Sequence, residues 1–216
     1  MKKRAKLIVA FLTLSLVMAC FAGCGSSNSE EEPKETTAAA VTVPEEVQAV
    51  KDKVTGLAEK YAKKLDGDWG DQQVALLESK EGEKYKDYKD MKAVLDSYRE
   101  ESGAYYIYAL YPTDLENVDS KPFMITVDGS EDPDPYGEEY EWEIQFQEAW
   151  KGAPAAARSA WADDEEGKDL CWSAFAPFHD SEGNIVGILG VDYPAPEILD
   201  FPEWNRDSDQ WNKIEE

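Results

Sequence analysis

The hydrophobic period of the chain changes at Gly103, and this change constrains the fold more than any other feature. Before Gly103, apolar residues recur at steps of three and four within 44–65 and again within 85–98, as expected for amphipathic helices. After Gly103 the period is two or the apolar runs are unbroken, which is typical of strands. Gly103 itself suits the end of the second helix, because glycine adopts the left-handed conformation of helix C-termini at little cost. The sequence therefore predicts helices first and a sheet second.

Four strands are predicted after Gly103, and their sequences are "AYYIYALY", "KPFMITVD", "DLCWSAFAPF" and "NIVGILGVDY". They are rich in aromatic and β-branched residues and are bounded by turn residues. The segments "PTDLENVDS" and "HDSEGN" are predicted to be hairpin connections within the first and the last pair. Between the pairs lie the acidic loop "DGSEDPDPYGEEYE" and a helical segment near 143–150. We expect an α+β domain, in which a long N-terminal helical region packs on a mostly antiparallel sheet.

Length and composition predict a single domain. The chain has 216 residues, 42% of them hydrophobic, which is enough to bury one core of ordinary size. The formal net charge is -24, which is typical of a solvated, highly soluble surface. So many acids argue against nucleic acid as a partner, because neutralising phosphates requires clustered Lys and Arg.

The N-terminal residues have the pattern of a secretory signal. Four basic residues within 2–6 precede an apolar run over 7–19. This run is too short to be a convincing membrane-spanning helix. We expect a signal peptide over 1–23 and a mature protein outside the cytoplasm.

The segment "FAGCGSSNS" around Cys24 resembles the lipobox of bacterial lipoproteins, in which the signal is cleaved before a Cys that carries a diacylglyceryl thioether. The resemblance implies that acyl chains such as palmitate hold the new N-terminus at the cell membrane. Two features leave alternatives open, since Phe21 stands where Leu is usual and "VMAC" at Cys20 is a second candidate. A plain secretory signal with two incidental cysteines is the remaining interpretation.

The rest of the chain divides into three parts. Residues 24–43 are rich in Ser, Glu, Thr and Ala without an apolar period, which predicts a disordered tether. Residues 44–205 are the predicted folded domain, and 206–216 are an acidic tail.

Cys171 is the only cysteine of the domain, so an internal disulfide is excluded there. Its apolar surroundings predict a small buried hydrophobic residue.

Three segments resemble, in wording and order, the Cache family of extracytoplasmic, PAS-like sensor domains: "YYIYALYPTD", "KPFMITVDGSEDPDPYGEEYE" and "LCWSAFAPFHDSEGNIVGILGVDY". The match covers 102–194, and the final hairpin is its most specific part. The resemblance implies a PAS-like sheet behind a long N-terminal helix, with a small metabolite bound between the sheet and its loop segment. Members of the family usually belong to chemoreceptors, histidine kinases and cyclic-dinucleotide enzymes.

The chain departs from this family pattern in two ways. It has a lipobox, and no kinase, cyclase or methyl-accepting region follows Tyr193. We therefore expect any signal to pass through a membrane sensor or transporter as partner. The Arg-x-Trp-Tyr-like cluster of amino-acid-binding members is not found, so amino acids are not favoured as ligands. The alternatives are an interaction module with a filled pocket, docked on such a partner, and an envelope enzyme.

Five residues are the candidate contacts of an unknown small molecule. Tyr106 and Tyr108 alternate to one face of the first strand, Trp172 lies on the third, and Asp128 and Asp192 end the second and fourth. Ligand sites are commonly apolar with a few convergent polar groups. Core packing is the competing role for the aromatic residues, and a solvated strand end or turn cap for Asp192. In Cache-like domains this strand end commonly faces the ligand, which implies that Asp192 accepts a cationic or hydroxylated one.

No catalytic, cofactor or metal site is predicted. The single histidine, His179, lies at a hairpin turn where solvent exposure is expected, so a hydrolase base and a zinc ligand set are both lacking. The acidic loop from Asp128 to Glu139 offers carboxylates to calcium. Its spacing fails the EF-hand pattern and two prolines stiffen it, so a solvated loop is the better interpretation. We expect a domain that is not an enzyme.

Overall fold

The structure is a computed structural model that describes residues 42–162 and 170–206. The predicted signal peptide over 1–23, Cys24 and all but the last two residues of the tether over 24–43 lie outside the described residues. The same holds for the predicted tail beyond Arg206. Within the described ranges, no helix is both long enough and apolar enough to cross a membrane.

Three helices form the N-terminal part of the domain: α1 (Glu45–Leu65), α2 (Asp68–Ser79) and α3 (Tyr88–Ser102). A single 3-10 turn, η1 (Gly82–Lys84), lies between α2 and α3. Acids in the first turn of α1 and lysines in its last turn complement the helix dipole. Gly103, at φ 74°, ends α3 as the sequence predicts, and its N–H donates to the carbonyl of Arg99.

The sheet is antiparallel throughout its strand pairs and has the order β3-β2-β1-β6-β5-β4. This confirms the predicted fold class and both predicted hairpins. The four long strands correspond to the four predicted ones, whereas β3 and β4 are two-residue strands that the sequence pattern does not indicate. The bounds are β1 (Tyr106–Pro112), β2 (Phe123–Asp128), β3 (Glu139–Tyr140), β4 (Ala155–Ala156), β5 (Cys171–His179) and β6 (Ile185–Pro194).

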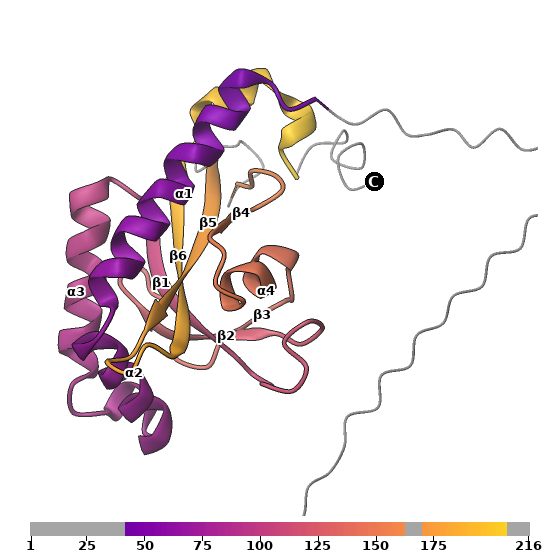
Figure 1. Cartoon of the computed structure of the whole chain (residues 1–216). Coiled ribbons are helices and arrows are strands. Elements are labelled where there is room, and N and C mark those ends of the chain that lie inside the picture. Colours follow the sequence, from indigo (N-terminus) through magenta and orange to yellow (C-terminus); the bar gives the residue numbers. More distant parts are fainter. Residues whose placement is uncertain (1–41, 163–169, 207–216) are drawn as a thin grey trace, which may run out of the picture. The chain divides into compact units, whose positions relative to one another are not determined.

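Helices cover both faces of the sheet. Figure 1 shows α1 running along one face, with α4 (Ile144–Trp150) on the other. Side chains alternate along β6, so Leu189 and Val191 join the core under α1, while Ile188 packs with Phe146 of α4 and Phe175 of β5. The last strand is therefore covered on each side, which suits the apolar residues on both of its faces.

The end of the described chain returns to the strand edges. After β6, two 3-10 turns follow, η2 (Pro196–Asp200) and η3 (Pro202–Trp204). The backbone of Trp204 accepts a hydrogen bond from the N–H of Ala160, and the N–H of Arg206 donates to the carbonyl of Ala160. This contact holds Arg206 beside the segment that follows β4.

Candidate ligand pocket

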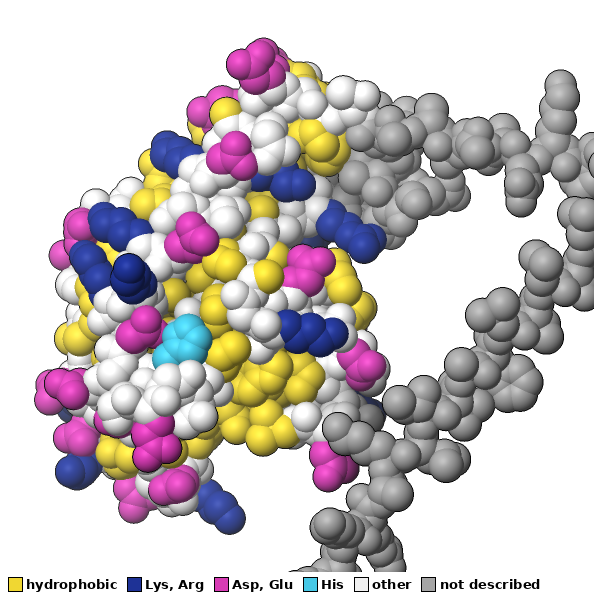
Figure 2. Space-filling view, in the orientation of Figure 1, with side chains coloured by type: hydrophobic (Ala, Val, Ile, Leu, Met, Phe, Trp, Pro, Cys, Tyr) yellow, Lys and Arg dark blue, Asp and Glu magenta, His cyan; other side chains and the backbone are white. Residues whose placement is uncertain are grey.

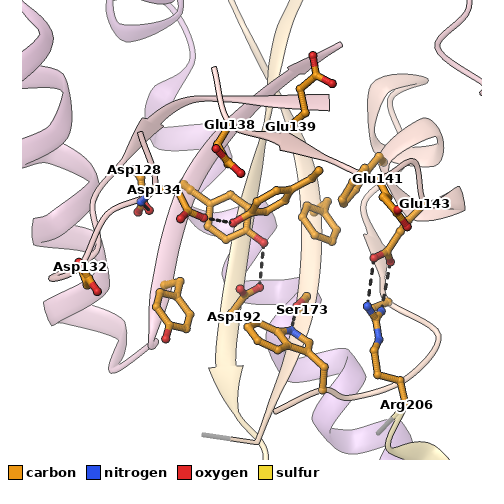
Figure 3. A pocket seen from close by; sticks show the side chains of 17 residues that line it. Asp128, Asp132, Asp134, Glu138, Glu139, Glu141, Glu143, Ser173, Asp192 and Arg206 are labelled. Carbon is orange, nitrogen blue, oxygen red and sulfur yellow. Dashed lines mark hydrogen bonds and ion pairs between the residues drawn. The ribbon is translucent and has the colours of Figure 1, made fainter. Parts of the chain in front are cut away.

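A pocket of about 630 Å³ lies on the α4 side of the sheet (Figure 3). Its floor comes from β1, β5 and β6, and its wall comes from the segment 128–143. Trp161 and Arg206 complete the lining from outside the long strands. The volume is in the range of sites for small metabolites and cofactors.

A row of three side chains crosses the floor of this pocket. Asp192 on β6 pairs with Tyr106 on β1 and with Ser173 on β5. Trp161 spans this row, because its indole N–H donates to the Ser173 hydroxyl at one end, at 3.0 Å, and its ring stacks with Tyr106 at the other end, at a centroid distance of 6.4 Å. Asp192 is only 3% exposed, which excludes a solvated strand end as its environment.

Tyr108 lies beside this row and donates a hydrogen bond to it. Its hydroxyl donates to Oδ1 of Asp192 at 3.2 Å, and its ring makes edge contacts with Tyr140 and Phe175. Burial and the neighbouring Asp192 carboxylate raise the pKa of Tyr108 well above its ordinary value. Tyr108 therefore stays protonated and acts as a hydrogen-bond donor.

Asp128, at the end of β2, organises the acidic loop that forms the pocket wall. Its carboxylate accepts hydrogen bonds from the N–H and hydroxyl of Ser130, at 2.8 and 2.5 Å, and from the N–H of Asp134 at 2.8 Å. Lys92 of α3 donates to the carbonyls of Asp128 and Ser130 at 2.7 and 3.0 Å. Burial raises the pKa of Asp128 despite these bonds. The loop is therefore not simply solvated, although its residues 131–133 are exposed.

The far end of the loop is joined to β3. The hydroxyl of Tyr140 donates to Oδ2 of Asp134 at 2.5 Å. Burial raises the pKa of Tyr140, and the bond to Asp134 raises it further. Asp128, Asp134 and Tyr140 thus form a continuous chain of hydrogen bonds that fixes the wall of the pocket.

The lining is strongly acidic. Eight of its seventeen residues are Asp or Glu, seven of them within 128–143 and the eighth Asp192. Arg206 is the one basic residue among the described lining residues, and it lies 3.3 Å from Glu143. Lysines gather elsewhere, since α1 carries five, and Figure 2 shows basic side chains along the upper left edge, over α1. The pocket side of the sheet is therefore strongly acidic, whereas α1 on the other side carries five lysines and four acids.

The structure brings four of the five predicted contact residues to one pocket, namely Tyr106, Tyr108, Asp128 and Asp192. Trp172 is not among them. Its side chain is fully buried in the core under α1, and its indole N–H donates to the carbonyl of Ala157 at 2.9 Å. Side chains alternate along β5, so the neighbouring Ser173 faces the pocket and Trp172 faces the helix. Trp172 therefore packs in the core, which is the role that competed with ligand binding, and it does not line the pocket.

His179 and Cys171 lie outside the pocket lining. His179 is partly exposed, and its Nδ1 lies 2.9 Å from Oδ1 of Asp66, so it joins the β5–β6 turn to the end of α1. Cys171 is buried in β5, as predicted. Within 42–162 and 170–206, no group of three or more His, Cys, Asp or Glu side chains is arranged to hold a metal ion.

Sequence reasoning missed four lining residues that shape the pocket. Tyr140 carried a signal, because it lies in the "GEEY" segment on which the Cache resemblance rests. Ser173 follows from strand alternation once the pairing of β5 with β6 is known. Trp161 and Arg206 carried no signal, because they belong to irregular segments that meet the sheet only in the folded chain.

Comparison with known proteins finds sixteen similar chains among the solved structures. No family model and no curated protein matches the chain. Among solved structures, the ligand-binding domain of the Campylobacter jejuni chemoreceptor Tlp3, in complex with 4-methylisoleucine, is 14% identical over 74% of this chain and 64% of its own, with a TM-score of 0.35. The extracellular domain of mmHK1S-Z2, named as a histidine kinase, is 15% identical over 73% and 58%, with a TM-score of 0.41.

The periplasmic domain of RsbU from Chlamydia trachomatis is a third match, 11% identical over 72% of this chain and 56% of that domain, with a TM-score of 0.36. The chain therefore spans less than two thirds of the length of each of these three structures.

Proposed function

We propose that this protein is an extracytoplasmic sensor-like domain that binds a small molecule, is held at the membrane by lipid on Cys24, and is not an enzyme. One observation carries the proposal. Tyr106, Tyr108 and Asp192, which the sequence pattern singles out together, line a single pocket of about 630 Å³. Concave sites with aromatic walls and a few convergent polar groups are the usual form of small-ligand sites.

The volume of the pocket favours ligand binding over the alternative of a purely interacting module. That alternative assumes that aromatic side chains fill the site, as Trp172 fills the core under α1. Tyr106 and Trp161 instead remain partly exposed at the pocket. The final hairpin, which resembles the Cache family most closely, supports the sensor role, and a membrane sensor or transporter is the proposed partner for any output.

Catalysis is not needed to explain the site. Nucleophilic catalysis by Ser requires a positioned base. His179, the single histidine of the chain, lies at the β5–β6 turn and not among the lining residues. The lining instead offers hydroxyl groups, carboxylates and aromatic faces, which suit reversible binding.

A thermal-shift screen tests the binding function. The full chain is screened against a panel of cationic, anionic, zwitterionic and neutral metabolites, and each hit is repeated on Asp192→Ala. We expect at least one hit that raises the unfolding temperature of the wild type and loses its effect on the variant. Glu59→Gln, which changes an exposed acid on α1, is the control and keeps the effect. A screen without hits, or hits that bind Asp192→Ala equally well, would remove this pocket from the proposal.

The lipid anchor is tested separately. Fatty-acid labelling of cells that express the wild type should mark the protein, and Cys24→Ser should abolish the label, because the thiol is the group that is alkylated. Cys20→Ser is the matched control and keeps the label. Continued labelling of Cys24→Ser would show that Cys24 is not the lipidated residue.

A further inference from the structure

We propose that the ligand of this pocket is a small organic amine, bound in its protonated form, that carries no carboxylate. The inference rests on the proposed function and names its ligand class. Two independent features of the lining carry it, which are the sign of its charge and the aromatic faces that enclose the same space.

Acidic residues outnumber basic ones more strongly in the pocket lining than in the chain as a whole. The described lining residues include eight carboxylates and one arginine, whereas the whole chain has 46 acids and 22 Lys and Arg. Asp192 is almost fully buried on the floor, where the low local dielectric strengthens its attraction for a cation. A protonated amine gains from this field wherever it binds in the pocket.

Aromatic faces supply the second feature, and four of the five rings, all except Tyr140, lie outside the acidic loop. Tyr106 and Trp161 stack beside Asp192, while Tyr108 makes edge contacts with Tyr140 and Phe175 across the floor. All five rings line the pocket. The faces of aromatic rings attract ammonium groups through their quadrupole, and they also cover the methylene groups of an organic cation. A hydrated inorganic cation gains little from such walls, so the enclosure favours an organic amine.

The single arginine explains why the amine should lack a carboxylate. An amino acid needs a positive group for its carboxylate, and Arg206 is the one basic residue in the described lining. Arg206 already donates to both carboxylate oxygens of Glu143, at 3.3 and 3.4 Å, as the dashed lines in Figure 3 mark. A second carboxylate brought to this site would meet Glu143 and the other acids of the wall, and like charges at close range repel.

Pairs of compounds that differ only in a carboxylate test the inference. Isothermal titration calorimetry of the full chain at pH 7 compares cadaverine with L-lysine, and phenethylamine with L-phenylalanine. We expect at least one amine to bind at least tenfold more tightly than its amino acid. Asp192→Asn should weaken that amine at least tenfold, while Glu59→Gln leaves it within twofold. Circular dichroism checks that both variants fold, and Tyr106→Leu, with an expected loss of at least threefold, takes the place of Asp192→Asn if that variant does not fold.

The outcomes separate this inference from the function on which it rests. Equal or tighter binding of the amino acids overturns the inference, and so does calcium chloride that binds more tightly than both amines. If a neutral or anionic metabolite from the thermal-shift panel binds and is lost on Asp192→Ala, the binding function stands and the amine assignment falls. If nothing in the panel binds, both are overturned.

Discussion

Tyr108 and Asp192 are hydrogen-bonded at 3.2 Å although they are not paired in the sheet. The register pairs Tyr108 with Gly190, and it pairs Asp192 with Tyr106. The ring of Tyr108 lies over Gly190, where a Cβ atom would come within 2.5 Å of its Cε2. The absence of a side chain at Gly190 therefore lets the Tyr108 hydroxyl extend along β6 to the carboxylate that forms the pocket floor.

The first prediction concerns Gly190. A methyl group there would displace the Tyr108 ring and press on Phe175, so Gly190→Ala should lower the free energy of unfolding by about 1–3 kcal/mol. It should also weaken binding of any ligand of the pocket, since the Tyr108 hydroxyl is moved from Asp192. Urea unfolding measures the stability. Gly56→Ala on α1, where a Cβ atom meets nothing within 4 Å, is the matched control and should be neutral or stabilising by up to about 1 kcal/mol. Equal stability of Gly190→Ala and wild type would refute the steric argument.

The second prediction concerns the buried carboxylate of Asp128. Asp128→Ala leaves the N–H groups of Ser130 and Asp134 without their acceptor, so the free energy of unfolding should fall by about 1–3 kcal/mol. Asp132→Ala removes an exposed acid from the same loop and should change the stability by less than about 0.5 kcal/mol. Urea unfolding of both variants makes the comparison. An equal loss of unfolding free energy in the two variants would contradict this role of Asp128.

The third prediction concerns the contact between α3 and the acidic loop. Lys92 donates to two carbonyls of the loop, so Lys92→Met should raise the rate of amide hydrogen exchange over 128–136 while exchange in β5 and β6 stays as in the wild type. Lys89→Met, an exposed neighbour on α3, is the control. Unchanged exchange in the loop of Lys92→Met would mean that the acidic loop keeps its order without this lysine.

The fourth prediction is a pH dependence on the side of the sheet away from the pocket. Lys60 and Lys64 of α1 donate to Glu101 of α3 at 2.8 and 3.0 Å, and these bonds lower the pKa of Glu101 from 4.5 to about 2. A carboxylate with a lowered pKa stabilises the fold above its ordinary pKa and loses this effect as the pH falls towards the lowered value. Wild type should therefore be more stable than Glu101→Gln at pH 7, and the difference should vanish between pH 4.5 and 2.

Urea unfolding at pH 7, 4 and 2 measures this difference, with Glu100→Gln, an exposed neighbour, as the control for the loss of one charge. A difference that persists unchanged at pH 2 would show that Glu101 acts through something other than its ion pairs. Salt should reduce the stability difference between wild type and Glu101→Gln at pH 7, because the side chains of Lys60, Lys64 and Glu101 are all about half exposed.

Much of the fold was predictable because its long elements have clear periods. The stripe of α1, the glycine end of α3 and the four long strands each combine pattern and punctuation. The extent of α2 was not predictable, since the apolar stretch over 74–79, "VALLES", is too short to fix a helix. Gly67, at φ 82°, turns the chain so that a new helix begins at Asp68. Strands β3 and β4 have two residues each, so no period exists to detect.

The pocket was predictable only where residues lie on strands of known direction. Tyr106, Tyr108 and Asp192 could be grouped because alternation and the final hairpin place them on the same end of the sheet. Trp172 was wrongly predicted to contact the ligand. A register difference of one residue exchanges the two faces of β5, and sequence alone does not fix that register. Arg206 and Trp161 meet the pocket through tertiary contacts such as those with Ala160 and Ser173, which leave no local pattern.

The central claim is that an organic amine binds in the pocket lined by Trp161 and Asp192, and the indole N–H signals test it most directly. In the full chain labelled with 15N at tryptophan, the N–H of Trp161 lies in the pocket and that of Trp172 lies in the core on the other face of the sheet. A titration with phenethylamine, with the two signals assigned from Trp161→Phe and Trp172→Phe, should shift the Trp161 signal saturably and leave the Trp172 signal in place. No shift of Trp161 at millimolar concentrations of either phenethylamine or cadaverine, or a shift of Trp172 alone, would contradict the claim.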